Sequence, residues 1–147
     1  MNKTLLTILL MHLLIINIHA KEPTGKIVVT IDNFRNNKGI VYIYLYNSTA
    51  KNEYPKTNYV LTIKKTNITK HKASVAFDNL EYDDYAIQIH HDEDNNNKLK
   101  TGFFGIPKKG IGFSNGAKPK FGPPKFHKAK IILNSDSLNT HISVIYL

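Results

Sequence analysis

The stretch that decides the fold is GIVYIYLY, residues 39–46. Its β-branched and aromatic residues alternate strictly, which places Val41, Ile43 and Leu45 on one face of an extended chain and three tyrosines on the other. Such alternation is typical of a β-strand that turns one face to a core. Shorter runs of the same kind occur at residues 26–31, 59–64, 73–77, 84–91, 129–133 and 140–146.

Seven short runs separated by polar turns, with no stretch of helical period, predict an all-β protein. We expect a single β-sandwich of about seven antiparallel strands, because two packed sheets are the usual arrangement of many short strands. Residues 77–87 place Leu80 and Tyr85 on either side of a tight turn. This phrase is similar to a crossover found in transthyretin-like modules, so we expect a transthyretin-like or immunoglobulin-like sandwich.

The N-terminal residues have the pattern of a secretory signal peptide. Lys3 gives a positive start, residues 5–16 are almost entirely apolar, and Ala20 offers a small residue for cleavage. We therefore expect a signal peptide at 1–20 and one domain at 21–147, soluble after cleavage and periplasmic or secreted. An uncleaved anchor is the alternative, because Ile18 is bulky for the position three residues before a cleavage site.

The composition excludes several classes of site. The chain has no cysteine, so it contains no disulfide, thiolate metal site or cysteine nucleophile. Its formal net charge is +9, but Arg35 is the only arginine. Arginine is the residue that forks onto phosphates and bases, so we expect no nucleic-acid partner. Attraction to an anionic surface of the cell envelope stays open.

Residues 102–126 break the rhythm of strands. They hold six of the eight glycines, four of the six prolines and five of the seven phenylalanines. Gly and Pro interrupt helices and ladders, so we expect no regular secondary structure here. The phenylalanines argue against disorder. A loop of this length is expected to be functional or packed upon itself.

Several short motifs occur in a fixed order: HDEDNNNKL at 91–99, GIPK at 105–108, GFSN at 112–115 and FGPPKF at 121–126. Together they resemble the bacterial family catalogued as domain of unknown function 2141, whose members look like small exported proteins. The resemblance extends over essentially the whole mature chain. Asn97 and Lys100 depart from it, because the family usually has Gly and Asp there. The resemblance implies fold and export and supplies no activity.

The acidic run after residue 91 is a candidate Ca²⁺ loop. Asp92, Asp94 and Asn96 give oxygen ligands at positions 1, 3 and 5, and the carbonyl of Lys98 would follow at position 7. Position 12, where calcium loops often carry a bidentate Glu, is Phe103. The alternative, which we favour, is a polar turn built by Asx residues.

The histidines next to this run invite a catalytic interpretation, which we do not favour. His90 and His91 point to opposite faces of a strand and cannot both bind one ion. A hydrolytic group of His91, Asp92 and Ser114 lacks any nucleophile elbow around the serine. We expect these histidines to bond to neighbouring loops, and we expect no enzyme.

The phenylalanines of the long loop are candidate ligand-binding residues. Phe103, Phe104, Phe113 and Phe121, interleaved with lysines, form a surface suited to a sugar, a lipid or an acidic polymer. The alternative is that they turn inward with Phe126 and cap the sandwich, which avoids an exposed apolar patch. We favour the cap.

These observations predict a non-enzymatic, exported β-sandwich accessory or binding module, with a candidate structural calcium loop at 92–98. The alternative is a metal-free module that binds an envelope glycan or lipid through the aromatic loop at 102–126. Expected partners are a cell-envelope glycan, lipid or protein.

Overall fold

The structure is a computed structural model that describes residues 22–96 and 109–147. The expected signal peptide at 1–20 lies outside these ranges. So do the site candidates Lys98, Phe103 and Phe104. No helix in the described ranges is long and apolar enough to cross a membrane.

The described chain is rich in strands and poor in helix. Its eight strands are β1 (Thr24–Asp32), β2 (Ile40–Asn47), β3 (Thr62–Asn67), β4 (Ala73–Glu81), β5 (Asp83–Asp92), β6 (Gly110–Phe113), β7 (Ile131–Leu133) and β8 (Ser137–Ser143). The helical elements are single turns: η1 (Ser48–Ala50), η2 (Thr57–Tyr59), η4 (Ser114–Gly116) and α2 (Phe126–Ala129). The expectation of an all-β protein is confirmed.

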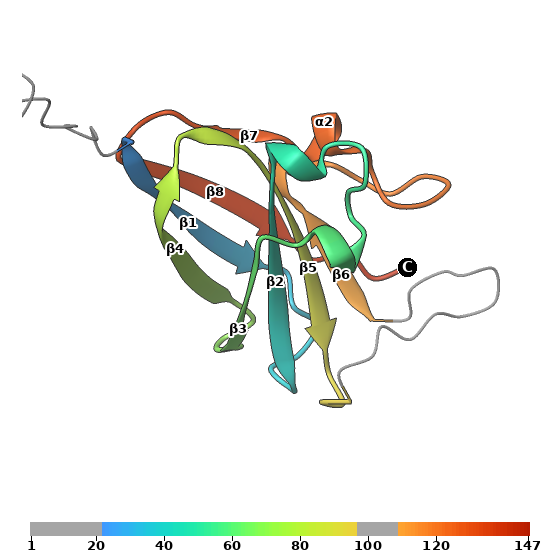
Figure 1. Ribbon diagram of the computed structural model, residues 1–147. Coiled ribbons are helices and arrows are strands. Elements are labelled where there is room, and N and C mark those ends of the chain that lie inside the picture. The colour runs from blue at the N-terminus through green and yellow to red at the C-terminus, as the bar shows by residue number, and fades with distance from the viewer. Residues whose placement is uncertain (1–21, 97–108) are drawn as a thin grey trace, which may run out of the picture.

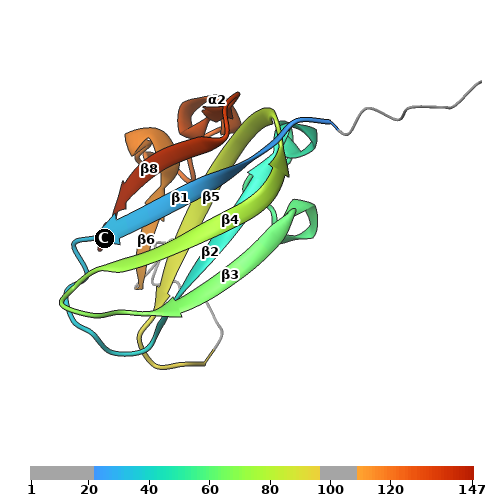
Figure 2. The same ribbon diagram turned by 90° about the vertical axis from the view of Figure 1, so that its left-hand side faces the viewer.

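The strands form two sheets that lie one against the other (Figures 1 and 2). The smaller sheet has the order β4-β1-β8. The larger has the order β3-β2-β5-β6, and β7 also pairs with β5. β6 pairs with the second half of β5 and β7 with its first three residues. The β3–β4 hairpin joins the two sheets at one edge, as Figure 2 shows.

Two expectations about the strands need correction. The strands are not all antiparallel, because β8 runs parallel to β1. After β7 the chain leaves the larger sheet and crosses to the smaller one, and this crossing brings β8 beside β1 in the same direction. The long loop at 102–126 also contains regular structure, since β6 lies within it. Each of the seven predicted runs overlaps an observed strand, and β6 is the addition.

The main core lies between the sheets and follows the alternation of β2. Val41, Ile43 and Leu45 are fully buried there, as their shared face predicted. They pack with inward residues of both sheets, including Ile27, Val29, Ile31, Phe77, Ile87, Ile89 and Ile142. One contiguous core thus draws on both sheets.

A second apolar cluster covers the outer face of the larger sheet. It contains Tyr46 and Ala86 from the sheet, Ile111 and Phe113 from β6, and Phe126 from α2. Ala50, Tyr54 and Ala129 complete it. The tyrosine face of β2 is therefore partly buried too, and the segments that follow β2 and β6 are fixed to the sheet.

Candidate functional site

A buried lysine closes the acidic turn that follows β5. Asp92 is the last residue of β5, and Asp94 and Asn96 lie in the turn. Lys109 stands directly before β6, which pairs with the end of β5. Its Nζ donates hydrogen bonds to the carboxylates of Asp92 and Asp94 and, over 2.7 Å, to Oδ1 of Asn96. Side chains from three alternating positions thus meet one ammonium group.

The centre of this ion pair is shielded from water. Lys109 is 4% exposed and Asp92 0%, whereas the side chain of Asp94 is 40% exposed. Burial opposes the charge on Lys109, but its hydrogen bonds to Asp92 and Asp94 outweigh burial and raise its pKa. The lysine is therefore a cation throughout the neutral range. It supplies the positive charge that an anionic Asp92 requires at zero exposure.

The calcium interpretation placed a cation among Asp92, Asp94 and Asn96, and the structure brings these three side chains together. The positive charge that they surround is the ammonium of Lys109. Calcium takes six to eight oxygen ligands, and within 22–96 and 109–147 no group of three or more His, Cys, Asp or Glu side chains converges. Calcium binding stays a prediction, and it requires Lys109 to move aside.

Sequence reasoning missed Lys109 because it missed β6. The register pairs His91 with Gly110, and this places the preceding lysine beside Asp92. The available signal was the alternation of Ile111 and Phe113 with glycines, which is a strand pattern of only four residues. Without that strand, nothing in the sequence connects position 92 with position 109.

A second ion pair holds the same turn from the other side. Glu93 accepts hydrogen bonds from the guanidinium of Arg35 and, over 2.7 Å, from Nδ2 of Asn36. The Arg35 guanidinium is the main cause that lowers the pKa of the Glu93 carboxyl. Both partners come from the loop between β1 and β2. Side chains from two other parts of the chain therefore hold the acidic turn.

The hydrolytic group of His91, Asp92 and Ser114 is not assembled. His91 is fully buried, with Nδ1 at 2.7 Å from the Tyr146 hydroxyl and Nε2 at 2.7 Å from a backbone carbonyl. Ser114 Oγ accepts a hydrogen bond from the amide of Ile87 over 2.8 Å, far from the acidic turn along β5. Both side chains join neighbouring segments, which is the role expected for polar groups at strand ends.

His90 points to the opposite face, as strand alternation requires. It is 5% exposed, and its Nε2 finds no hydrogen-bond partner among the residues that the structure describes. Burial lowers its pKa to about 4, and the nearby charge of Lys109 acts in the same direction. The Tyr42 ring stacks beside it at a centroid distance of 6.3 Å. His90 is thus a buried, neutral imidazole at neutral pH.

The described phenylalanines of the aromatic loop divide into two kinds. Phe113 and Phe126 are 3% and 5% exposed and pack in the second apolar cluster. Phe121 is fully exposed. Phe113 and Phe126 therefore turn inward, as the expected cap requires, whereas Phe121 lies on the surface.

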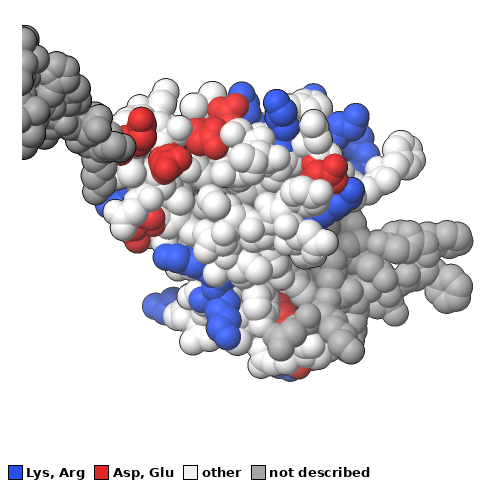
Figure 3. All heavy atoms as spheres, in the orientation of Figure 1, with Lys and Arg blue, Asp and Glu red and all other residues white. Residues whose placement is uncertain are grey.

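Lysines gather around this exposed ring. We call residues 117–128 the lysine loop. It carries Lys118, Lys120, Lys125 and Lys128, and no Asp or Glu occurs anywhere from 114 to 130. The loop encloses a hollow of about 740 Å³, which these lysines, Phe121 and two prolines line. Figure 3 shows blue side chains around the upper right of the molecule, where Figure 1 places the loop beside α2.

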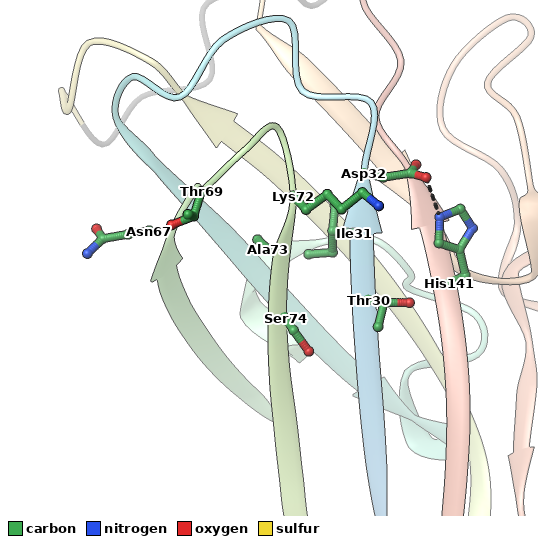
Figure 4. Close-up of a pocket in the computed structure, with 9 residues that line it drawn as sticks. All are labelled: Thr30, Ile31, Asp32, Asn67, Thr69, Lys72, Ala73, Ser74 and His141. Atoms are coloured by element: carbon green, nitrogen blue, oxygen red, sulfur yellow. Dashed lines mark ion pairs between the residues drawn. The ribbon is translucent and has the colours of Figure 1, made fainter.

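A polar recess of about 480 Å³ lies where the ends of β1, β4 and β8 meet the β3–β4 turn (Figure 4). His141 Nε2 lies 3.0 Å from Oδ2 of Asp32, and Ser143 donates a 2.9 Å hydrogen bond to the same carboxylate. The side chains of His141 and Asp32 are 56% and 40% exposed. Water screens such an open pair, so we assign no site to this recess.

One comparison with known proteins identifies the chain. The profile of a family described as an uncharacterized protein conserved in bacteria (DUF2141) matches residues 29–141. The chain belongs to this family. The match includes the acidic turn, Lys109 and the lysine loop. No curated protein and no solved structure matches the chain.

Proposed function

We propose that this DUF2141 protein is a non-enzymatic, exported β-sandwich module that binds an anionic partner of the cell envelope through the lysine loop. The observation that carries the proposal is the full exposure of Phe121 among four lysines. The other described phenylalanines of the aromatic segment are buried in the apolar cluster. The loop therefore presents one ring to solvent while the same segment is fixed to the sheet on both sides.

Charge and shape together distinguish this loop from an ordinary polar surface. A single exposed apolar residue needs no explanation by itself. Here the Phe121 side chain is surrounded by lysines, and the 17 residues from 114 to 130 include no acidic side chain. Lysines repel one another at such density, which costs stability unless an anion neutralises them. An anionic partner converts that repulsion into attraction.

Both ends of the lysine loop are anchored to the rest of the fold. Phe113 precedes it and Phe126 lies at its end, and both are anchored in the apolar cluster on the sheet. Asn115 Nδ2 donates a 3.1 Å hydrogen bond to the carbonyl of Lys128, which ties the two ends together. Binding surfaces that are held in place lose less conformational freedom on association.

Retention on a polyanion column, measured as the salt concentration of elution, tests the proposal. A variant with Lys118, Lys120, Lys125 and Lys128 replaced by Gln should elute at clearly lower salt. The matched control replaces the four lysines of the β3–β4 hairpin (Lys64, Lys65, Lys70 and Lys72) by Gln, which removes the same charge. Equal losses in both variants would show that net charge, and not the lysine loop, drives binding.

A structural calcium ion in the acidic turn remains a secondary proposal. Its support is the convergence of Asp92, Asp94 and Asn96 on one cation position. The same convergence limits it, because the ammonium of Lys109 takes that position. A role for calcium therefore depends on competition with this lysine.

A further inference from the structure

We infer that the partner of the lysine loop is an anionic lipid bilayer, into whose headgroup region Phe121 inserts. This inference rests on the proposed function and adds the chemistry of the partner. It starts from the Phe121 ring, which is fully exposed to solvent although it also lines the hollow. A fully exposed apolar ring surrounded by cations can enter the interface of an anionic membrane.

The polar groups around the ring also favour headgroups over glycans. Besides Phe121, the hollow is lined by lysines, prolines, glycines and Ala117, with Asn115 as its only amide side chain and no carboxylate. Sugar hydroxyls need paired acceptors and donors in fixed places. The lysine ammonium groups can only donate hydrogen bonds, and their flexible side chains let the charges move. Such groups match phosphates that diffuse within a membrane surface.

The arrangement combines the two forces that hold proteins at an anionic membrane. Lysines close to a negatively charged surface each contribute about fivefold in affinity. Transfer of one phenylalanine from water into the interface contributes roughly tenfold or more. The prolines of the lysine loop, Pro119, Pro123 and Pro124, add apolar surface without backbone amides that need a partner. Either force alone would give weak attachment.

The absence of tryptophan from the sequence permits a sharp test. Phe121→Trp introduces a single indole at the tip of the lysine loop, and Ile63→Trp provides a matched reporter. Ile63 is also apolar and 51% exposed, but it lies on the edge strand β3. The probes are vesicles of phosphatidylcholine with or without phosphatidylglycerol. The readouts are emission wavelength and quenching by lipids brominated on the acyl chain.

We expect a blue shift and bromine quenching for F121W only when phosphatidylglycerol is present, and neither change for I63W. Because the apolar residues 5–16 can bring any variant of the full chain to a vesicle, the depth of one side chain is measured rather than sedimentation. Phe121→Ala in the full chain removes the inserting ring and keeps the four lysines of the loop. It should leave elution from the polyanion column almost unchanged.

The outcomes separate the two proposals. If the column result holds but F121W stays unshifted and unquenched, the lipid inference is overturned and the loop binds an acidic polymer in water. If the lysine variant elutes as the native chain does, the proposed function fails as well. A shift of equal size with uncharged vesicles would overturn the anionic part of the inference, because insertion would then not need the lysines.

Discussion

Replacing Lys109 by methionine removes the charge that lets Asp92 be buried. Methionine keeps most of the length and apolar stem of lysine but leaves the aspartate without its ammonium partner. Breaking a buried pair on one side costs about 3–5 kcal/mol. The loss of the bond to Asp92 should cost a free energy in the upper part of this range, because Asp92 is 0% exposed and water cannot replace the ammonium. The bond with Asp94 adds less, because its side chain is 40% exposed and water screens it.

The expected loss is large on a thermal scale. Each kcal/mol shifts the melting midpoint of a chain of this size by about 3–5 °C, so Lys109→Met should lower it by about 10–25 °C. Circular dichroism measures the midpoint, and urea unfolding gives the free energy directly. The matched control is Lys65→Met on β3, where the lysine is exposed; its free energy of unfolding should change by less than about 0.5 kcal/mol.

A double-mutant cycle decides whether the pair itself causes the loss. Asp92→Asn removes the negative charge that Lys109 neutralises, so the combination of both changes should be clearly more stable than the sum of the single losses predicts. We expect a coupling of about 2 kcal/mol or more. Additive losses would refute the reasoning, because they would show that each side chain stabilises the protein independently of the other.

Calcium provides a second, independent arm of the same experiment. If the ammonium of Lys109 keeps its place against the ion, the melting midpoint of the native chain is the same in chelator and in millimolar calcium. In the Lys109→Met variant the oxygens of Asp92 and Asp94 are released, and calcium should recover part of the loss. A calcium-dependent rise in the native chain that Asp92→Ala and Asp94→Ala abolish would contradict this. Calcium would then displace the lysine.

The remaining predictions concern other side chains of the fold. The pKa of buried His90 is lowered from 6.5 to about 4, so folding disfavours its protonation. The free energy of unfolding should therefore be highest above pH 6.5 and should fall by about 3 kcal/mol as the pH is lowered to 4. His90→Gln should flatten this acid profile, whereas His127→Gln at an exposed site should not. Gly39→Ala should cost about 2 kcal/mol or more by urea unfolding, since φ is +73° and a Cβ would lie 2.0 Å from the carbonyl oxygen of Asp92. By the same assay, Phe113→Ala should cost about 3–5 kcal/mol and Phe121→Ala less than about 0.5 kcal/mol; similar costs would contradict the division between buried and exposed rings.

The sequence predicted the strands of the core well because burial there follows simple alternation. In β2, Val41, Ile43 and Leu45 are buried on one face as expected, and the expected turns separate the strands. Pairing between distant strands has no such local signature. The parallel contact of β1 with β8 joins residues more than 100 positions apart, and it depends on where the chain crosses between sheets.

Glycine misled the prediction at β6. Gly110 and Gly112 suggested a strand breaker, but each leaves room for a side chain of another segment. A Cβ on Gly110 would lie 2.6 Å from Val144 Cγ1, and one on Gly112 would lie 2.7 Å from Ile142 Cγ2. These glycines allow close packing of β6 against the C-terminal part of the chain. The requirement is tertiary, so no property of residues 110–113 alone reveals it.

The two unusual features of the protein lie at opposite ends of β5 and use charge in opposite ways. At the end that carries Asp92, positive charge is buried and fully matched by carboxylates. The other end pairs with β7 beside α2, where the lysine loop projects with positive charge that its own segment does not neutralise (Figure 1). Matched, buried charge stabilises a fold and is hidden from partners. Unmatched, exposed charge weakens a fold slightly and attracts partners. Lys109 should therefore govern stability, whereas the lysine loop should govern recognition. The effect of a variant at one end of β5 on stability or binding can then be interpreted without a correction for the other end.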